Sequence, residues 1–71
     1  MRRFVLNRKE DVTGVSGTGI VAEGVLFGND VAVVQWLSDF PTSVVWHQRG
    51  MESIEAVHGH NGSTAIEWLD P

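Results

Sequence analysis

The sequence predicts a mainly β domain, a small five-stranded barrel with one short helix between the fourth and fifth strands. Short runs of β-branched and aromatic residues recur along the chain, separated by glycine, proline and polar turn residues. One stretch, residues 51–58, has apolar residues at helical spacing instead. The chain has only 71 residues and therefore forms one domain, residues 1–71. Five short strands in so short a chain bury most apolar surface when the sheet bends and closes on itself.

The first predicted strand, Phe4–Leu6, is short and ends in the charged stretch 7–11. The glycine-rich segment 12–19 then predicts a turn or a strongly bent strand. Basic residues on an edge strand discourage pairing with other chains, and the same residues could instead form an anion-binding patch. Four of the five basic residues lie in this N-terminal part: Arg2, Arg3, Arg8 and Lys9.

A β-hairpin is the strongest local prediction. Residues 20–27 and 31–37 are rich in β-branched residues, and Gly28-Asn29-Asp30 between them tolerates positive φ. Both faces of the second arm carry apolar residues, which predicts a strand buried on both sides.

The second half of the chain predicts two more strands and the helix. Pro41 ends the hairpin arm because it lacks the N–H that a ladder needs, and residues 43–47 follow as the fourth strand. Within residues 51–58, Ile54, Val57 and His58 share one helical face. Gly59 is a plausible end of the helix, and residues 64–69 form the fifth strand.

This order of elements resembles the SH3-like barrel, in which a one-turn helix separates the last two strands. An OB-like barrel, with its helix between the third and fourth strands, is the second choice. The whole chain also resembles a group of small proteins associated with actinobacteria and their phages, a resemblance that implies no activity and no catalytic residues. It rests on residues 10–19, Gly24-Val25, Val33, Gln35-Trp36, Ser43-Val44-Val45-Trp46, Ser53-Ile54-Glu55 and His58-Gly59-His60.

Composition narrows the functional classes. The absence of cysteine excludes disulfides and thiolate zinc sites, and an intracellular, cytoplasmic protein is the simplest expectation. Neither a signal-peptide core nor an apolar stretch of about 20 residues occurs, so no membrane association is expected. The net charge of −4 disfavours general affinity for nucleic acid.

Cofactor and metal motifs are weak. Gly17-x-Gly19-x-x-Ala22 formally matches a dinucleotide fingerprint, but the residues after it predict a strand where the fingerprint needs a helix. His58 and His60, with His47, supply too few ligands for a typical zinc site. We therefore expect no cofactor and no metal.

Catalytic motifs are equally weak. Serine, histidine and aspartate occur, but no nucleophile elbow fixes their spacing. The pair Glu52 and Glu55 is explained by the helix N-terminus, where the helix dipole favours acidic residues. We therefore predict that the protein is not an enzyme and has no catalytic residues.

The tryptophans are the most informative residues. Trp36, Trp46 and Trp68 all lie on predicted strands, and so small a core cannot enclose every aromatic side chain. Exposed aromatic surface commonly marks an interface. The segment Trp46-His47-Gln48-Arg49 is the chosen candidate, although an ordinary polar turn explains it equally well. A groove for proline-rich peptides is not expected, because the chain has no tyrosine and residues 7–19 carry no aromatic residue.

The sequence thus predicts a protein interaction module that self-associates and, if phage-encoded, acts on a host or other cellular protein. The alternative is a small nucleic-acid-binding barrel that uses an exposed tryptophan and the basic residues Arg2, Arg3, Arg8 and Lys9.

Overall fold

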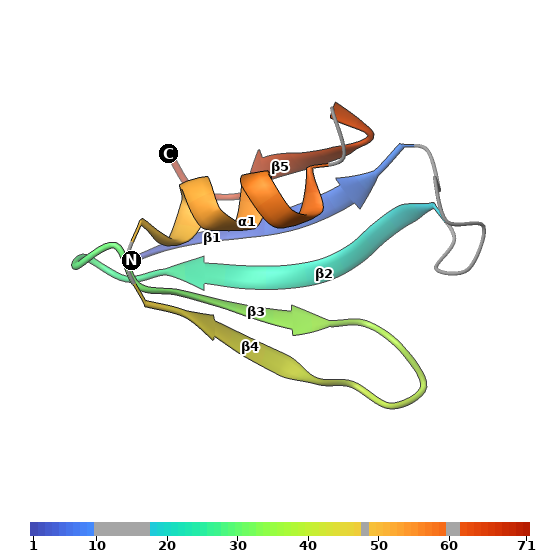
Figure 1. Ribbon diagram of the computed structural model, residues 1–71, viewed down its shortest axis with the longest axis horizontal. Helices are drawn as coiled ribbons and strands as arrows, with labels where there is room; N and C mark the ends of the chain where they lie inside the picture. Colours follow the sequence, from blue (N-terminus) through green and yellow to red (C-terminus); the bar gives the residue numbers. More distant parts are fainter. Residues whose placement is uncertain (10–17, 48, 60–61) are drawn as a thin grey trace.

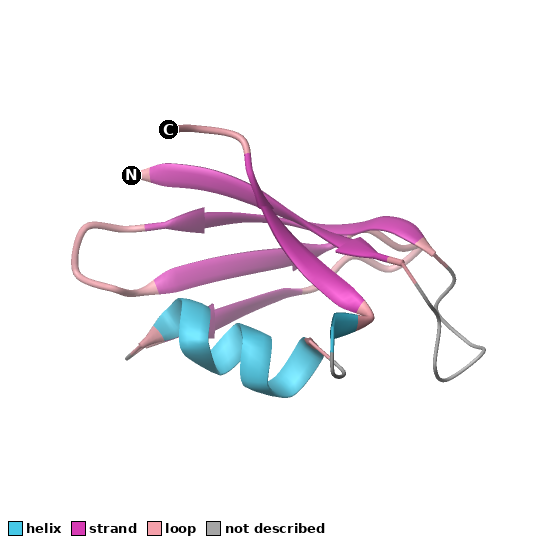
Figure 2. Cartoon of the chain, turned by 90° about the horizontal axis from the view of Figure 1, so that it is seen from above, coloured by secondary structure: helices cyan, strands magenta, loops and turns pink. Residues whose placement is uncertain are grey.

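The computed structural model describes residues 1–9, 18–47, 49–59 and 62–71, which form a two-layer domain. One layer is a five-stranded antiparallel sheet, and the other is a helix packed across one of its faces (Figures 1 and 2). The elements are β1 (Arg2–Arg8), β2 (Gly19–Leu26), β3 (Ala32–Trp36), β4 (Ser43–Trp46), α1 (Gly50–His58) and β5 (Thr64–Trp68). No helix in these described ranges is long and apolar enough to cross a membrane.

The mainly β class and the helix between the fourth and fifth strands are confirmed, whereas the barrel is wrong. The strand order is β4-β3-β2-β1-β5, and within the described residues β4 and β5 remain the two edges of an open sheet. The physical reason is the helix, which has nine residues and lies across one face as a second layer (Figure 2). That layer buries the apolar face, so the sheet need not close to form a core.

The first strand is longer and more central than the sequence predicts. β1 has seven residues and pairs with β2 on one side and with β5 on the other. Its basic residues therefore do not protect a sheet edge. Arg2 and Arg8 face the helix side together with the apolar Phe4 and Leu6, since alternate residues of a strand share a face.

The core lies between the sheet and α1. Phe4, Leu6, Val34 and Ile54 are its largest fully buried side chains, and each contributes roughly 1.5–3 kcal/mol by leaving water. β3 is buried on this side only, because Gln35 on its other face is exposed. The remaining members of the core are Val21, Ala22 and Ala32, with the partly buried Leu26, Trp36, Trp46, Met51 and Ile66 around them.

The predicted β2–β3 hairpin is confirmed, and its turn explains the sequence Gly28-Asn29-Asp30. The backbone N–H of Phe27 donates to the carbonyl of Val31 at 2.8 Å, which leaves three residues in the loop. Asp30 has φ 66°, the left-handed conformation that ends such three-residue loops. The Asn29 side chain accepts a hydrogen bond from the Val31 N–H at 3.3 Å.

The same turn anchors the start of α1. The backbone N–H of Gly50 donates to the carbonyl of Asp30 at 3.0 Å, and a Cβ on Gly50 would lie 2.8 Å from the Ala32 Cβ. Glycine is therefore required for the helix to approach the hairpin this closely. Farther along the helix Ile54 is buried, whereas Val57 is exposed.

Candidate functional site

All three tryptophans lie on the helix-covered side of the sheet, and two of them, Trp36 and Trp46, contact His58 at the end of α1. The centre of the His58 ring lies 4.8 Å from that of Trp36 and 5.6 Å from that of Trp46, both in edge-to-face geometry. Trp36 and Trp46 are half-buried, and the buried indole N–H of Trp46 has no hydrogen-bond partner among the described residues. These indoles therefore complete the core at the end of α1.

The metal hypothesis gains no support from this geometry. His58 lies between two indoles, His47 is exposed beyond β4, and His60 lies outside the described residues. Within the described part of the chain, no group of three or more histidine, aspartate or glutamate side chains is placed to hold a metal ion.

The segment predicted as an interface, Trp46 to Arg49, connects β4 to α1. His47 and Arg49 are exposed, and Gln48 lies outside the described residues. Arg49 adopts the left-handed conformation, with φ 49°, immediately before the helix. Its guanidinium lies 3.8 Å from the Glu52 carboxylate, an exposed ion pair that contributes little to stability.

Trp68 is the most exposed indole. It ends β5 with 37% of its surface exposed, and its ring meets that of Phe4 edge-to-face at 5.4 Å. The Arg2 guanidinium carbon lies 3.9 Å from the centre of the Trp68 ring, a cation–π contact. The Arg2 guanidinium therefore covers one face of the Trp68 ring.

The structure separates the four N-terminal basic residues. Arg2 stacks on Trp68 and Arg8 is buried on the helix side, whereas Arg3 faces the opposite side of the sheet. The Arg3 guanidinium donates to both carboxylate oxygens of Asp70, at 2.8 and 3.0 Å. These hydrogen bonds lower the pKa of Asp70 to about 2. Lys9 is exposed beyond β1, so these residues do not form one basic track.

The face of the sheet opposite α1 carries an apolar groove of about 520 Å³. A row of side chains in register across four strands, Arg3, Val25, Val33 and Val45, runs along this face, and its first three members line the groove. Val45 is 49% exposed, and Phe27 beside the row is 39% exposed. No described element covers this face, and its lining residues are Arg3, Phe4, Glu23, Gly24, Val25, Phe27, Val33, Gln35, Ser43 and Leu69.

The two sheet edges differ in chemistry. β4 reads Ser-Val-Val-Trp, with neither charge nor proline, and its first three residues are exposed. β5 carries Glu67, whose carboxylate accepts a hydrogen bond from the Asn7 side chain at 2.8 Å, and Asp70 and Pro71 follow it. Charged residues and proline are the usual protection of an edge strand, so β5 is protected and β4 is not.

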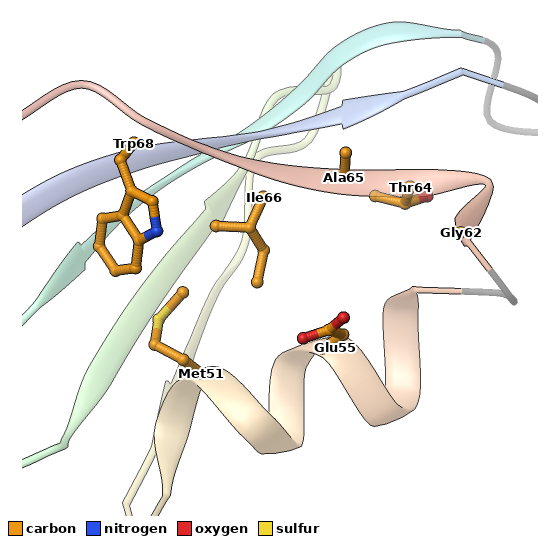
Figure 3. Close-up of a pocket in the computed structure, with 7 residues that line it drawn as sticks. All are labelled: Met51, Glu55, Gly62, Thr64, Ala65, Ile66 and Trp68. Carbon is orange, nitrogen blue, oxygen red and sulfur yellow. The ribbon is translucent and has the colours of Figure 1, made fainter.

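A second groove, of about 500 Å³, lies between α1 and β5. Figure 3 shows Met51 and Glu55 extending from the helix toward the strand, where Ile66 and Trp68 extend toward the helix. Thr64 also lines the groove, and its buried hydroxyl has no hydrogen-bond partner among the described residues. Gly62 and Ala65 complete the lining.

A comparison with known protein families shows which family the chain belongs to. The family model described as Acb5 phage protein matches residues 1–70. The chain belongs to the Acb5 phage protein family. The phage part of the sequence resemblance is therefore confirmed, and the actinobacterial part stays a prediction. Neither the curated proteins nor the solved structures contain a significant match.

For this Acb5 family chain, the sequence drew attention to the tryptophans but not to the two grooves. The position of both grooves depends on which face of the sheet α1 covers. No local sequence pattern predicts which face that is. One signal was available: Ser43-Val44-Val45-Trp46 is a strand without a single charge, which already suggests an unprotected edge.

Proposed function

We propose that this phage protein is a non-enzymatic interaction module that self-associates through the free edge of β4. The observation that carries the proposal is the chemistry of that edge. None of its residues is charged, the first three are exposed and two of these are β-branched valines, whereas the opposite edge, β5, is followed by Asp70 and Pro71. An unprotected edge of this kind is a template for pairing with another strand.

The hydrogen-bond pattern of β4 supports this proposal. The N–H of Trp36 donates to the carbonyl of Thr42 at 2.8 Å. Hydrogen-bonded and non-hydrogen-bonded pairs alternate along an antiparallel ladder, so the backbone groups of Ser43 and Val45 face away from β3. A second chain that lies beside β4 can use these groups without disturbing the sheet.

A second copy is the partner that fits this edge best. Two β4 strands related by a twofold axis pair antiparallel, and Val45 then lies opposite its counterpart. This arrangement extends the row Arg3, Val25, Val33 and Val45 into the same row of the second copy. The result is a continuous ten-stranded sheet with one apolar stripe, a symmetric contact of the kind most homodimers use.

Light scattering coupled to gel filtration tests the self-association. The wild-type chain is expected to elute as a dimer, and Val45→Lys as a monomer, because two lysines would meet on the twofold axis. Val45→Thr keeps the shape and β propensity of the edge and is the matched control, expected to remain dimeric. A monomeric wild-type chain, or a dimer that survives Val45→Lys, would refute pairing through β4.

Membership of a phage protein family supports a further part of the proposal, that the assembled module acts on a host protein. The open face, with its apolar groove, offers a surface for such a partner. Affinity purification from host lysate with nuclease present should retain one host protein with the wild-type chain and lose it with Val33→Lys, which places a charge in the groove. Retention by both chains would exclude the open face, and partners that vanish with nuclease would favour the nucleic-acid alternative.

A further inference from the structure

The groove between α1 and β5 combines apolar walls with two polar groups. Met51, Ile66 and Trp68 supply the apolar surface, and the Glu55 carboxylate extends into the space between helix and strand (Figure 3). Its volume of about 500 Å³ lies within the range of small-molecule sites. An apolar pocket with a few converging polar groups is the usual form of such a site.

Thr64 gives the stronger indication of a ligand. The residue is only 6% exposed, and its hydroxyl is buried without a hydrogen-bond partner among the described residues. A buried hydroxyl that lacks a partner costs folding free energy, so native proteins rarely leave one without a reason. A ligand group in the groove would supply the missing hydrogen bond.

The Glu55 carboxylate indicates the charge that such a ligand should carry. Its carboxylate makes no ion pair or hydrogen bond with the described residues, and an ionised carboxylate can only accept hydrogen bonds. Two described cations lie on the helix side of β1. Arg2 is stacked on Trp68, and the buried Arg8 pairs with Thr64 across the β1–β5 ladder, but neither side chain lines the groove. The net charge of −4 also favours cations over anions.

We propose that this groove binds a small organic cation. Its apolar body contacts Met51, Ile66 and Trp68, and its ammonium or amidinium group donates hydrogen bonds to Glu55 and Thr64. The proposal is independent of self-association, because β5 and β4 are opposite edges of the sheet. The monomeric Val45→Lys chain should retain the site, so the two proposals can fail separately.

Three probes that share a phenyl ring separate charge from shape: phenethylamine, 2-phenylethanol and 3-phenylpropionate. Each is titrated into the ¹⁵N-labelled chain, and backbone amide shifts are followed by NMR. Phenethylamine is expected to shift residues 51–55 and 64–68 with a Kd on the order of 1 mM, typical of so small a ligand. The alcohol should bind more weakly, and the carboxylate should not bind.

Variants test the assigned roles. Glu55→Gln and Thr64→Val keep the shapes of the side chains and should weaken phenethylamine binding by at least about fivefold, while Glu52→Gln, on the same helix outside this groove, should leave it unchanged. Thr64→Val should also keep the wild-type Tm, because it removes the hydroxyl that lacks a partner. Absent shifts in these segments, equal shifts with all three probes, or binding that survives Glu55→Gln would overturn the proposal.

Discussion

Gly24 shows how strongly one residue can constrain the core. It lies opposite Phe4 across the β1–β2 ladder, and a Cβ at this position would overlap the fully buried Phe4 ring. Ala22 and Val34, on either side, are fully buried as well, so the ring has little room to move. We therefore expect Gly24→Ala to lower the free energy of unfolding by about 1–3 kcal/mol, the usual cost of overpacking.

Urea denaturation followed by tryptophan fluorescence measures this effect. Gly28→Ala is the matched control, because a Cβ at Gly28 has no atom within 4 Å and the residue lies in the exposed hairpin turn. Its unfolding free energy should stay within about 0.5 kcal/mol of the wild-type value. Equal effects of the two substitutions would show that the loss of glycine, not the contact with Phe4, is responsible.

At the scale of single residues, the sequence predicts which positions are apolar better than it predicts which side chains touch in the core. The pattern of residues 20–27 marks Gly24 as part of a strand, but its contact with Phe4 follows from the β1–β2 register, which is not local information. The same is true of Thr64. Its place at the start of a strand was predictable, whereas its burial depends on where α1 lies.

At the scale of elements, the Arg3–Asp70 ion pair fastens the end of the chain to β1. The N–H of Leu69 donates to the carbonyl of Arg3 at 2.9 Å, and both the backbone N–H and the guanidinium of Arg3 donate to Asp70. The pKa of Asp70 is lowered from 3.8 to about 2, so the folded chain binds fewer protons than the unfolded chain between these values. The contribution of Asp70 to stability is therefore fully present above about pH 4 and disappears as the pH falls toward 2.

Thermal unfolding of the wild type and Asp70→Asn between pH 2 and pH 6 tests this linkage. The wild-type Tm should exceed that of Asp70→Asn at pH 5 to 6, and the difference should shrink as the pH falls to about 2. Arg3→Gln provides the control background, since the pH dependence of the difference should largely vanish without the guanidinium. A difference that stays constant with pH, or that persists in Arg3→Gln, would contradict the assigned cause.

Some helices and strands are specified by their own local sequence, whereas the positions of others depend on residues far along the chain. The β2–β3 hairpin was predictable because Gly28-Asn29-Asp30 specifies its own turn, and residues 51–58 already carry the helical spacing. The position of β1 was not predictable. Its central place depends on β5, whose residues 64–68 return beside it only after the helix has crossed the sheet.

At the scale of the whole molecule, the barrel prediction was wrong because the sequence does not reveal how much of the sheet one helix covers. Apolar residues on both faces of residues 31–37 suggested burial on both sides, which a closed barrel provides. In the structure α1 covers one side, and the apolar residues Val33 and Val45 of the other side remain partly or largely exposed. The same apolar pattern therefore belongs to a partly exposed face of the sheet instead of a second core face, and this face is the one on which the proposed self-association rests.

This difference predicts that the stability of the molecule depends on its concentration. If two chains pair through β4, unfolding also dissociates them, and a tenfold increase in protein concentration should raise the wild-type Tm by about 3–5 °C. The Val45→Lys chain should show a Tm independent of concentration, because its folded and unfolded states are both monomeric, while Val45→Thr should follow the wild type. Differential scanning calorimetry over a hundredfold concentration range measures this dependence. A wild-type Tm that does not change with concentration would mean that the open sheet is stable alone and would contradict pairing through β4.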